Sequence, residues 1–156
     1  MIGMEARLLR FAVAIGCLVP IGAGAAGMLL GPRLLGPDAV GSGDLDSQFR
    51  YLSGLLLAIG VGYLSTIPHI ETHGRRFLLL TCIVVVGGIG RLLSLPAIGP
   101  PSPVMLAALV MELIVTPGLA VWQHRMARAH RQRSDLGRQS RSTLEPVISR
   151  PDRSGR

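Results

Sequence analysis

Residues 11–30 read FAVAIGCLVPIGAGAAGMLL, and these 20 positions contain no charged side chain. A bilayer core about 30 Å thick is crossed by roughly 17 to 25 helical residues, so this stretch is long enough to span a membrane. The chain as a whole is 49% hydrophobic and 16% charged, whereas soluble domains carry about 25% charged residues. This composition excludes a soluble enzyme domain, a disordered chain and a secreted disulfide scaffold.

Three more apolar stretches follow the first, and together they predict helical spans at 8–30, 49–67, 77–95 and 104–122. The connectors at 31–48, 68–76 and 96–103 are rich in proline, glycine or charge. No stretch alternates strictly between apolar and polar residues, so a β-barrel is not expected. We therefore predict an all-α polytopic membrane protein in which residues 1–122 form an antiparallel four-helix transmembrane bundle.

The charged residues are distributed unevenly between the two ends of this bundle. All 16 basic residues are arginines, and 13 of them lie in the first ten residues, in the 68–76 connector or after the fourth span. The 31–48 connector has one arginine against three aspartates, and the 96–103 connector has no charge. Positive charge stays on the cytoplasmic side of membranes, so we predict a bacterial inner-membrane protein with both termini cytoplasmic.

The first span has an alternative interpretation as a cleaved signal peptide. Arg7 and Arg10 precede an apolar run, and Ala23, Gly24 and Ala25 resemble a small-residue cleavage site. The apolar run is longer than the usual signal core of about 7–15 residues, which favours a retained span. Cleavage would instead leave three spans and an external N-terminus.

Small residues predict where the helices pack, because close backbone approach is what favours helix association in lipid. Gly54, Ala58 and Gly62 form a ridge at i, i+4 and i+8 on span two, and span one carries Ala23, Gly27 and Gly31 at the same spacing. Pro20 and Pro117 are expected to kink spans one and four. We interpret these features as packing within one chain; a dimer contact or a flexible gate is the alternative.

Two ionisable residues lie at least one turn inside predicted spans, where a charge costs about 2.5–3.5 kcal/mol on insertion scales and marks a candidate functional site. Arg91 is four residues from the outer end of span three, and Glu112 is eight residues into span four. At 1.5 Å per residue these depths differ by about 6 Å, which a flexible arginine can largely close. We therefore expect that Arg91 and Glu112 can pair.

Further polar residues are expected at the same depth in the membrane as Arg91 and Glu112. Asp46 and Ser47 can cap span two, and Asp46 and Arg50 have the i, i+4 spacing of a helical salt bridge. With Gln48 they complete a predicted polar cluster in the outer half of the bundle: Asp46, Gln48, Arg50, Arg91 and Glu112.

Three roles for this cluster stay open at the level of sequence. The first is a structural ion-pair network that fixes helix register in an accessory membrane protein. The second is a pocket that binds or transports a small polar, anionic or lipid-like ligand from the outer side, because the arginine fork suits carboxylate or phosphate. The third, proton or ion translocation, is the least favoured because a single acid makes a poor relay.

The sequence contains no constellation typical of catalysis or metal binding. The segment His69–His73 lacks the His-Glu-x-x-His spacing of zinc hydrolases, and no histidine lies inside a span beside a serine nucleophile. Cys17 and Cys82 are expected on the reducing side, where a disulfide does not persist. We therefore expect no enzyme activity, no metal and no cofactor.

Residues 123–156 form a basic tail with nine arginines against three acidic residues, a net charge of +6. Its composition predicts disorder, except that the first turn or two extends span four and lies against anionic lipid headgroups. The tail has no aromatic residue for base stacking, so nucleic acid is not expected as a partner. The expected partners are the bilayer and either a second copy of the chain or another membrane protein.

Two short motifs and the span pattern resemble a known family. The motifs are DSQFRYL at 46–52 and GGIGRLLS at 87–94, with Glu112 in the following span. Together they resemble the small bacterial four-helix membrane proteins grouped as the domain of unknown function DUF4345, over about Leu8 to Trp122. The resemblance implies that span one is retained, and it implies no activity, cofactor or catalytic residue.

Overall fold

A computed structural model describes residues 2–36, 39 and 41–148. Within these residues the fold is all-α, without a strand, as the sequence predicts. Four helices are long and apolar enough to cross a membrane, with mean hydropathies of their most apolar stretches between 1.5 and 2.2. The chain is therefore a membrane-spanning α-helical protein.

The first two spans form a helical hairpin, which we call hairpin one. Helix α1 (Ile2–Leu30) continues into a short 3₁₀ helix, η1 (Gly31–Leu35), and α2 (Gly43–Leu64) returns antiparallel along it. Proline 20 lies within α1 without ending it. A 3₁₀ turn, η3 (Ile67–His69), then leads to the third span.

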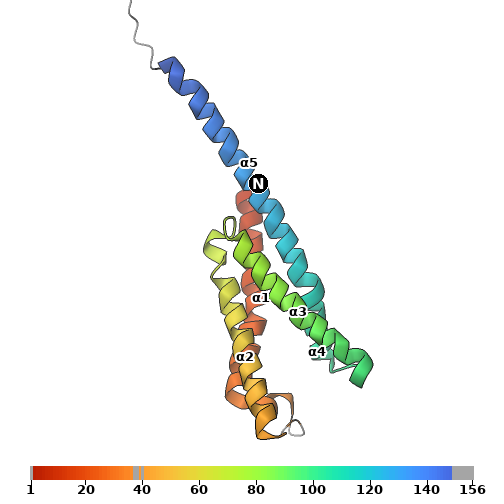
Figure 1. The fold of residues 1–156 in the computed structure, drawn as a ribbon. Coiled ribbons are helices and arrows are strands. Elements are labelled where there is room, and N and C mark those ends of the chain that lie inside the picture. The colour runs from red at the N-terminus through yellow and green to blue at the C-terminus, as the bar shows by residue number, and fades with distance from the viewer. Residues whose placement is uncertain (1, 37–38, 40, 149–156) are drawn as a thin grey trace, which may run out of the picture.

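The last two spans form hairpin two. Helix α3 (Gly74–Ile98) is followed by α4 (Pro103–Val110), a π-helical turn η4 (Met111–Val115) and α5 (Thr116–Ile148), which succeed one another without a break. Helix α5 extends past the start of α1 and away from the other helices (Figure 1). It is helical to Ile148, whereas the sequence analysis expects disorder after the first turn or two.

The continuous helix has a physical reason in its composition. From Gln123 to Thr143 the chain has six arginines, three glutamines and two alanines, which have high helix propensity, and it contains no proline. Such residues sustain a helix that the preceding span has already nucleated, because propagation is much easier than nucleation. Residues 149–156 lie outside the described part of the chain.

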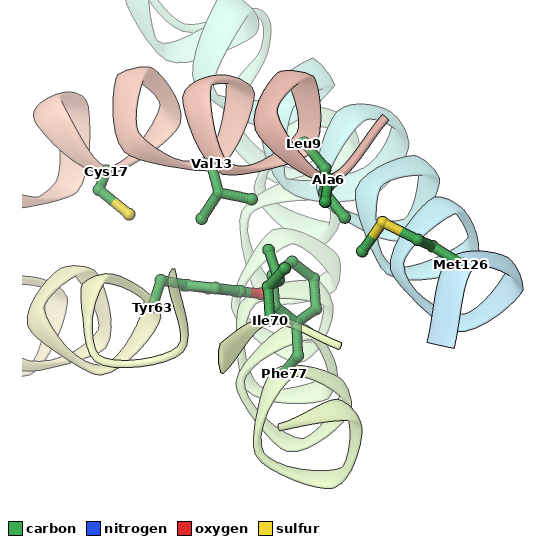
Figure 2. Close-up of a cluster of buried hydrophobic side chains, with 8 residues drawn as sticks. All are labelled: Ala6, Leu9, Val13, Cys17, Tyr63, Ile70, Phe77 and Met126. Carbon is green, nitrogen blue, oxygen red and sulfur yellow. The ribbon is translucent and has the colours of Figure 1, made fainter. Parts of the chain in front are cut away.

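In the part of the chain that the structure describes, the hairpins pack against each other at one end. That end holds the N-terminus, the segment between α2 and α3 and the middle of α5, and we call it the junction; at the opposite end α2 and α3 diverge (Figure 1). The buried cluster at the junction draws on α1, the end of α2, the 65–73 segment, α3 and α5 (Figure 2). Its members are Ala6, Leu9, Val13, Cys17, Tyr63, Ile70, Phe77 and Met126.

The packing face of α2 is rotated by one residue from the predicted small-residue ridge. A Cβ on Gly24 of α1 would lie 2.6 Å from the backbone nitrogen of Leu57, and Gly27 abuts the side chain of Ser53. Of the predicted ridge, Ala58 is exposed and Gly62 meets Leu80 of α3 instead. Helix α2 thus meets α1 through Ser53, Leu57 and Gly60, and Gly54 of the predicted ridge lies beside Met28 of α1.

Candidate functional site

The first pair of the predicted cluster, Asp46 and Arg50, lies in the first two turns of α2. Arg50 donates from Nε to Asp46 Oδ2 at 2.8 Å and from Nη2 to Asp46 Oδ1 at 3.2 Å, so the pair is bidentate. Helix α2 begins at Gly43, six residues before the predicted start of span two. The N-cap is therefore Ser42, whose Oγ accepts from the Leu45 nitrogen, and not Asp46 or Ser47 as predicted.

Arg50 also binds the end of the neighbouring helix. Its Nη1 donates to the carbonyl oxygens of Met28 at 2.6 Å and Leu29 at 3.1 Å. These carbonyls lie in the last turn of α1. Carbonyls in the last turn of a helix have no intrahelical N–H partner, and the helix dipole favours a cation beside them. Gly31 follows with a φ of +64°, and a Cβ there would meet both Asp46 and Arg50. The Asp46–Arg50 pair thus closes the end of hairpin one.

The second pair, Arg91 and Glu112, joins α3 to the π-helical turn in hairpin two. Arg91 donates from Nε to Glu112 Oε2 and from Nη2 to Glu112 Oε1, each at 3.1 Å. Its Nη1 lies 3.0 Å from the Met105 sulfur. The Arg91 side chain is 35% exposed and that of Glu112 is 18% exposed. The chain therefore neutralises its two deepest ionisable residues against each other.

Local backbone features hold Arg91 and Glu112 in this arrangement. Pro117 has no N–H and would clash with a carbonyl four residues earlier in a regular helix, and the turn before it is a π-helix. Both the backbone nitrogen and Oγ1 of Thr116 donate to the Met111 carbonyl. Gly88, one turn before Arg91, lets α3 approach, because a Cβ there would be 3.0 Å from Glu112 Cβ.

The five residues of the predicted cluster do not form one site. Asp46 and Arg50 belong to hairpin one, whereas Arg91 and Glu112 belong to hairpin two. No hydrogen bond or ion pair connects the two pairs within the described residues, and Gln48 is exposed without a hydrogen bond there. The difference arises because the hairpins diverge at this end, which a sequence-derived depth cannot reveal.

Sequence reasoning missed a set of polar contacts at the junction. Gln123, which is 2% exposed, donates from Nε2 to the Ile70 carbonyl at 2.7 Å and so ties α5 to the 65–73 segment. Arg10 of α1 pairs with Glu71 at 2.8 Å. Glu71 is the single acid in the 68–76 connector, so the sequence could have indicated an ion pair between it and a nearby arginine.

A third polar contact at the junction connects α2 with α3. The hydroxyls of Tyr63 and Thr81 lie 3.0 Å apart, and Thr81 Oγ1 is also 2.9 Å from the Phe77 carbonyl. The Tyr63 ring packs edge-on against Phe77 with centroids 5.0 Å apart. The aromatic pair belongs to the buried cluster (Figure 2), and the hydroxyl pair joins it to Thr81.

The remaining candidate ligands do not assemble. His69 and His73 pack edge to face with ring centroids 5.8 Å apart, and no group of three metal-ligating side chains occurs within the described residues. Cys17 is buried, Cys82 is exposed, and both are free. Two buried nitrogens at the junction, Arg10 Nε and His73 Nδ1, have no hydrogen-bond partner.

Comparison with known proteins agrees with the family resemblance. The model of a domain of unknown function, DUF4345, matches residues 8–123, which include the Arg10–Glu71, Asp46–Arg50 and Arg91–Glu112 pairs. No curated protein and no solved structure matches the chain. Because the family model covers most of the chain and all four spans, this protein is a member of the DUF4345 family.

Proposed function

We propose that this protein is a structural or accessory component of a membrane, acting through its helical scaffold and without catalysis. One observation supports this role above the others: the ionisable residues at membrane depth satisfy each other within each hairpin. Arg91 and Glu112 form a bidentate pair, and Asp46 and Arg50 form another. The partly buried Arg91–Glu112 pair joins two helices, and a pair in that position can fix the register between them.

An accessory role implies a protein partner within the bilayer, either a second copy of the chain or another membrane protein. Hairpin two has the faces for it, because only 6% of the most apolar stretch of its last span is buried within the chain. Cys82 is the exposed cysteine of this hairpin and allows cross-linking in membranes without any substitution. A cross-linked species at the mass of two chains would identify a homo-oligomer, and one at another mass would identify a different partner.

We further propose that the membrane is a bacterial inner membrane and that both termini are cytoplasmic. The support is the placement of arginines at the junction end, opposite the uncharged connector after α3. Thr72 and Ser102 are exposed and flank α3 at its two ends. In a background without Cys17 and Cys82, a membrane-impermeant maleimide should label Ser102→Cys in intact spheroplasts and Thr72→Cys only after lysis. The reverse labelling pattern would overturn this orientation.

The structural role is tested by removing and then restoring the Arg91–Glu112 pair. Glu112→Gln leaves a guanidinium without its counter-ion at membrane depth, a loss of about 3 kcal/mol on insertion scales. We expect a much lower abundance in membranes and a lower melting temperature, with recovery in the charge-swapped protein Arg91→Glu/Glu112→Arg. Glu5→Gln is the matched control, since Glu5 is an exposed acid at the start of α1.

A second candidate function is the binding of an anionic or lipid-like ligand at Arg91. The arginine is 35% exposed and donates three of its five N–H groups to Glu112 and Met105, which leaves two N–H groups for another acceptor. Under this alternative, Arg91→Gln stays folded at normal abundance and loses a small molecule that native mass spectrometry detects on the wild-type protein. A Glu112→Gln protein of unchanged stability would overturn the structural role and favour this one.

A further inference from the structure

A group of exposed arginines surrounds the junction between the hairpins. None of them forms an ion pair within the described residues, where the carboxylate of Glu71 is paired with Arg10. Arg76 donates only to the Ser65 hydroxyl, at 3.4 Å. The group comprises Arg7 of α1, Arg75 and Arg76 of α3, and Arg125 and Arg128 of α5.

Contacts among their neighbours place these arginines at one level. Gly74 abuts the Gln123 side chain, so the first turn of α3 lies beside the part of α5 that carries Arg125. Ala6 and Leu9 share the buried cluster with Met126, so the first turns of α1 meet the same part of α5 (Figure 2). The arginines therefore come from both hairpins and converge where the hairpins pack.

Their depth corresponds to lipid headgroups. The apolar part of span four ends near Trp122, and Arg125 and Arg128 follow by about 4.5 and 9 Å at 1.5 Å per residue. A headgroup layer is about 5–8 Å thick on each side of the bilayer core, so Arg125 lies inside it and Arg128 at its edge. Because α5 extends away from the other helices (Figure 1), the part of this helix beyond Arg128 leaves this layer.

We propose that the junction binds the phosphates of anionic phospholipids and that these lipids bridge the two hairpins. The arginine fork donates two parallel hydrogen bonds to a phosphate, and a net negative headgroup is favoured over a zwitterionic one by the uncompensated positive charge around it. A lipid held by Arg7 on one side and by Arg75, Arg76, Arg125 or Arg128 on the other adds a connection at the region where the hairpins pack. This inference is independent of the role of the Arg91–Glu112 pair.

The test compares the full-length protein in nanodiscs of phosphatidylcholine alone and of an equal mixture with phosphatidylglycerol. A ligand that binds only the folded state raises its stability, so the wild-type melting temperature should be higher in the mixture. The variant with Arg75, Arg76, Arg125 and Arg128 all changed to Gln should lose this increase and most of the phosphatidylglycerol adducts seen by native mass spectrometry. It should melt like the wild type in phosphatidylcholine, which shows that it folds.

Two single variants make the test specific. Arg33→Gln removes an exposed arginine at the opposite end of the molecule and should keep the full increase. Arg7→Gln should lose it although four arginines remain on hairpin two, because bridging needs a donor on each hairpin. A wild-type increase that persists in the fourfold variant overturns the binding site, and one that persists in Arg7→Gln overturns the bridging. An acidic protein or nucleic acid retained by the wild type, with no response to phosphatidylglycerol, overturns the assignment to lipid.

Discussion

Each hairpin joins two antiparallel helices in lipid, but the contacts that hold the helices together differ between the two hairpins. In hairpin one, α1 and α2 touch backbone to backbone at Gly24, and Arg50 closes the far end on the carbonyls of α1. In hairpin two, α3 meets the π-helical turn through Gly88 and is held by the Arg91–Glu112 pair. The first hairpin relies on close helix packing, and the second relies on a side-chain ion pair.

This difference follows the amount of protein that surrounds each hairpin. The most apolar stretches of the first two spans are each 22% buried within the chain, against 11% and 6% for the third and fourth. Where helices cannot bury faces against each other, an ion pair in a low-dielectric surrounding becomes the principal fixed contact. Hairpin two is accordingly less covered by the rest of the chain than hairpin one, which is why we propose it as the side that meets a partner.

Among substitutions that change the packing between helices, the largest effect is expected at Gly24. In Gly24→Ala the new Cβ would lie within 3 Å of Leu57 N, Ser53 O and Leu57 Cα, which are all backbone atoms and cannot move aside independently. The helices of hairpin one must separate, at a cost of about 3 kcal/mol, the upper end of the usual range for overpacking. We expect a fall of about 6–12 °C in melting temperature, measured in detergent by size-exclusion chromatography after heating.

Gly22→Ala is the matched control on the same helix. A Cβ at Gly22 meets nothing within 4 Å, and alanine favours a helix over glycine by about 1 kcal/mol. The control should therefore be as stable as the wild type or slightly more stable. Equal losses in both variants would show that hairpin one does not depend on close backbone contact at Gly24.

Sequence patterns located the helices because the signals are long. A stretch of about 20 residues without a charge identifies a membrane span almost independently of which apolar residues it contains. The ends are less determined: α2 begins at Gly43 because Ser42 caps it, six residues before the predicted start at Phe49. Small-residue spacing predicted the existence of a packing ridge on α2 but missed its face by one position, since Gly54 and Ser53 differ by about 100° around the helix.

The depth of each site residue in the membrane could be predicted from the sequence, but its position in the plane of the membrane could not. Depth follows from counting residues, so the Arg91–Glu112 pair could be anticipated, and i, i+4 spacing gave the Asp46–Arg50 pair. Whether the two pairs share a site depends on the angle between the hairpins. The role of Gln123 was not predicted for a related reason. Its partner is the backbone carbonyl of Ile70, and a sequence does not show which backbone carbonyl lies beside a given side chain.

An intermediate effect is expected from breaking the connection between the hairpins at Gln123. In Gln123→Leu the side chain keeps about the same volume, but the buried Ile70 carbonyl loses its donor, which costs about 2 kcal/mol. Gln132→Leu is a suitable control, because Gln132 is an exposed glutamine farther along the same helix. Melting temperatures that fall equally in both variants would mean that the junction does not depend on this hydrogen bond.

The smallest effect concerns the approach of α3 to the π-helical turn. In Gly88→Ala the new Cβ would lie 2.8 Å from Leu113 Cδ2 and 3.0 Å from Glu112 Cβ. The leucine methyl can rotate away, so the loss is limited to about 1 kcal/mol, well below that of Gly24→Ala. Gly87→Ala, where a Cβ meets nothing within 4 Å, is the control and should not destabilise the protein.

A double variant separates the two kinds of contact in hairpin two. If Gly88 acts by positioning Arg91 against Glu112, then Gly88→Ala should cost little once Glu112→Gln has already removed the pair. The two losses would then be less than additive in melting temperature, as expected for groups that share one contact. Fully additive losses would show that Gly88 serves helix packing alone, and hairpin two would then resemble hairpin one more closely than its ion pair suggests.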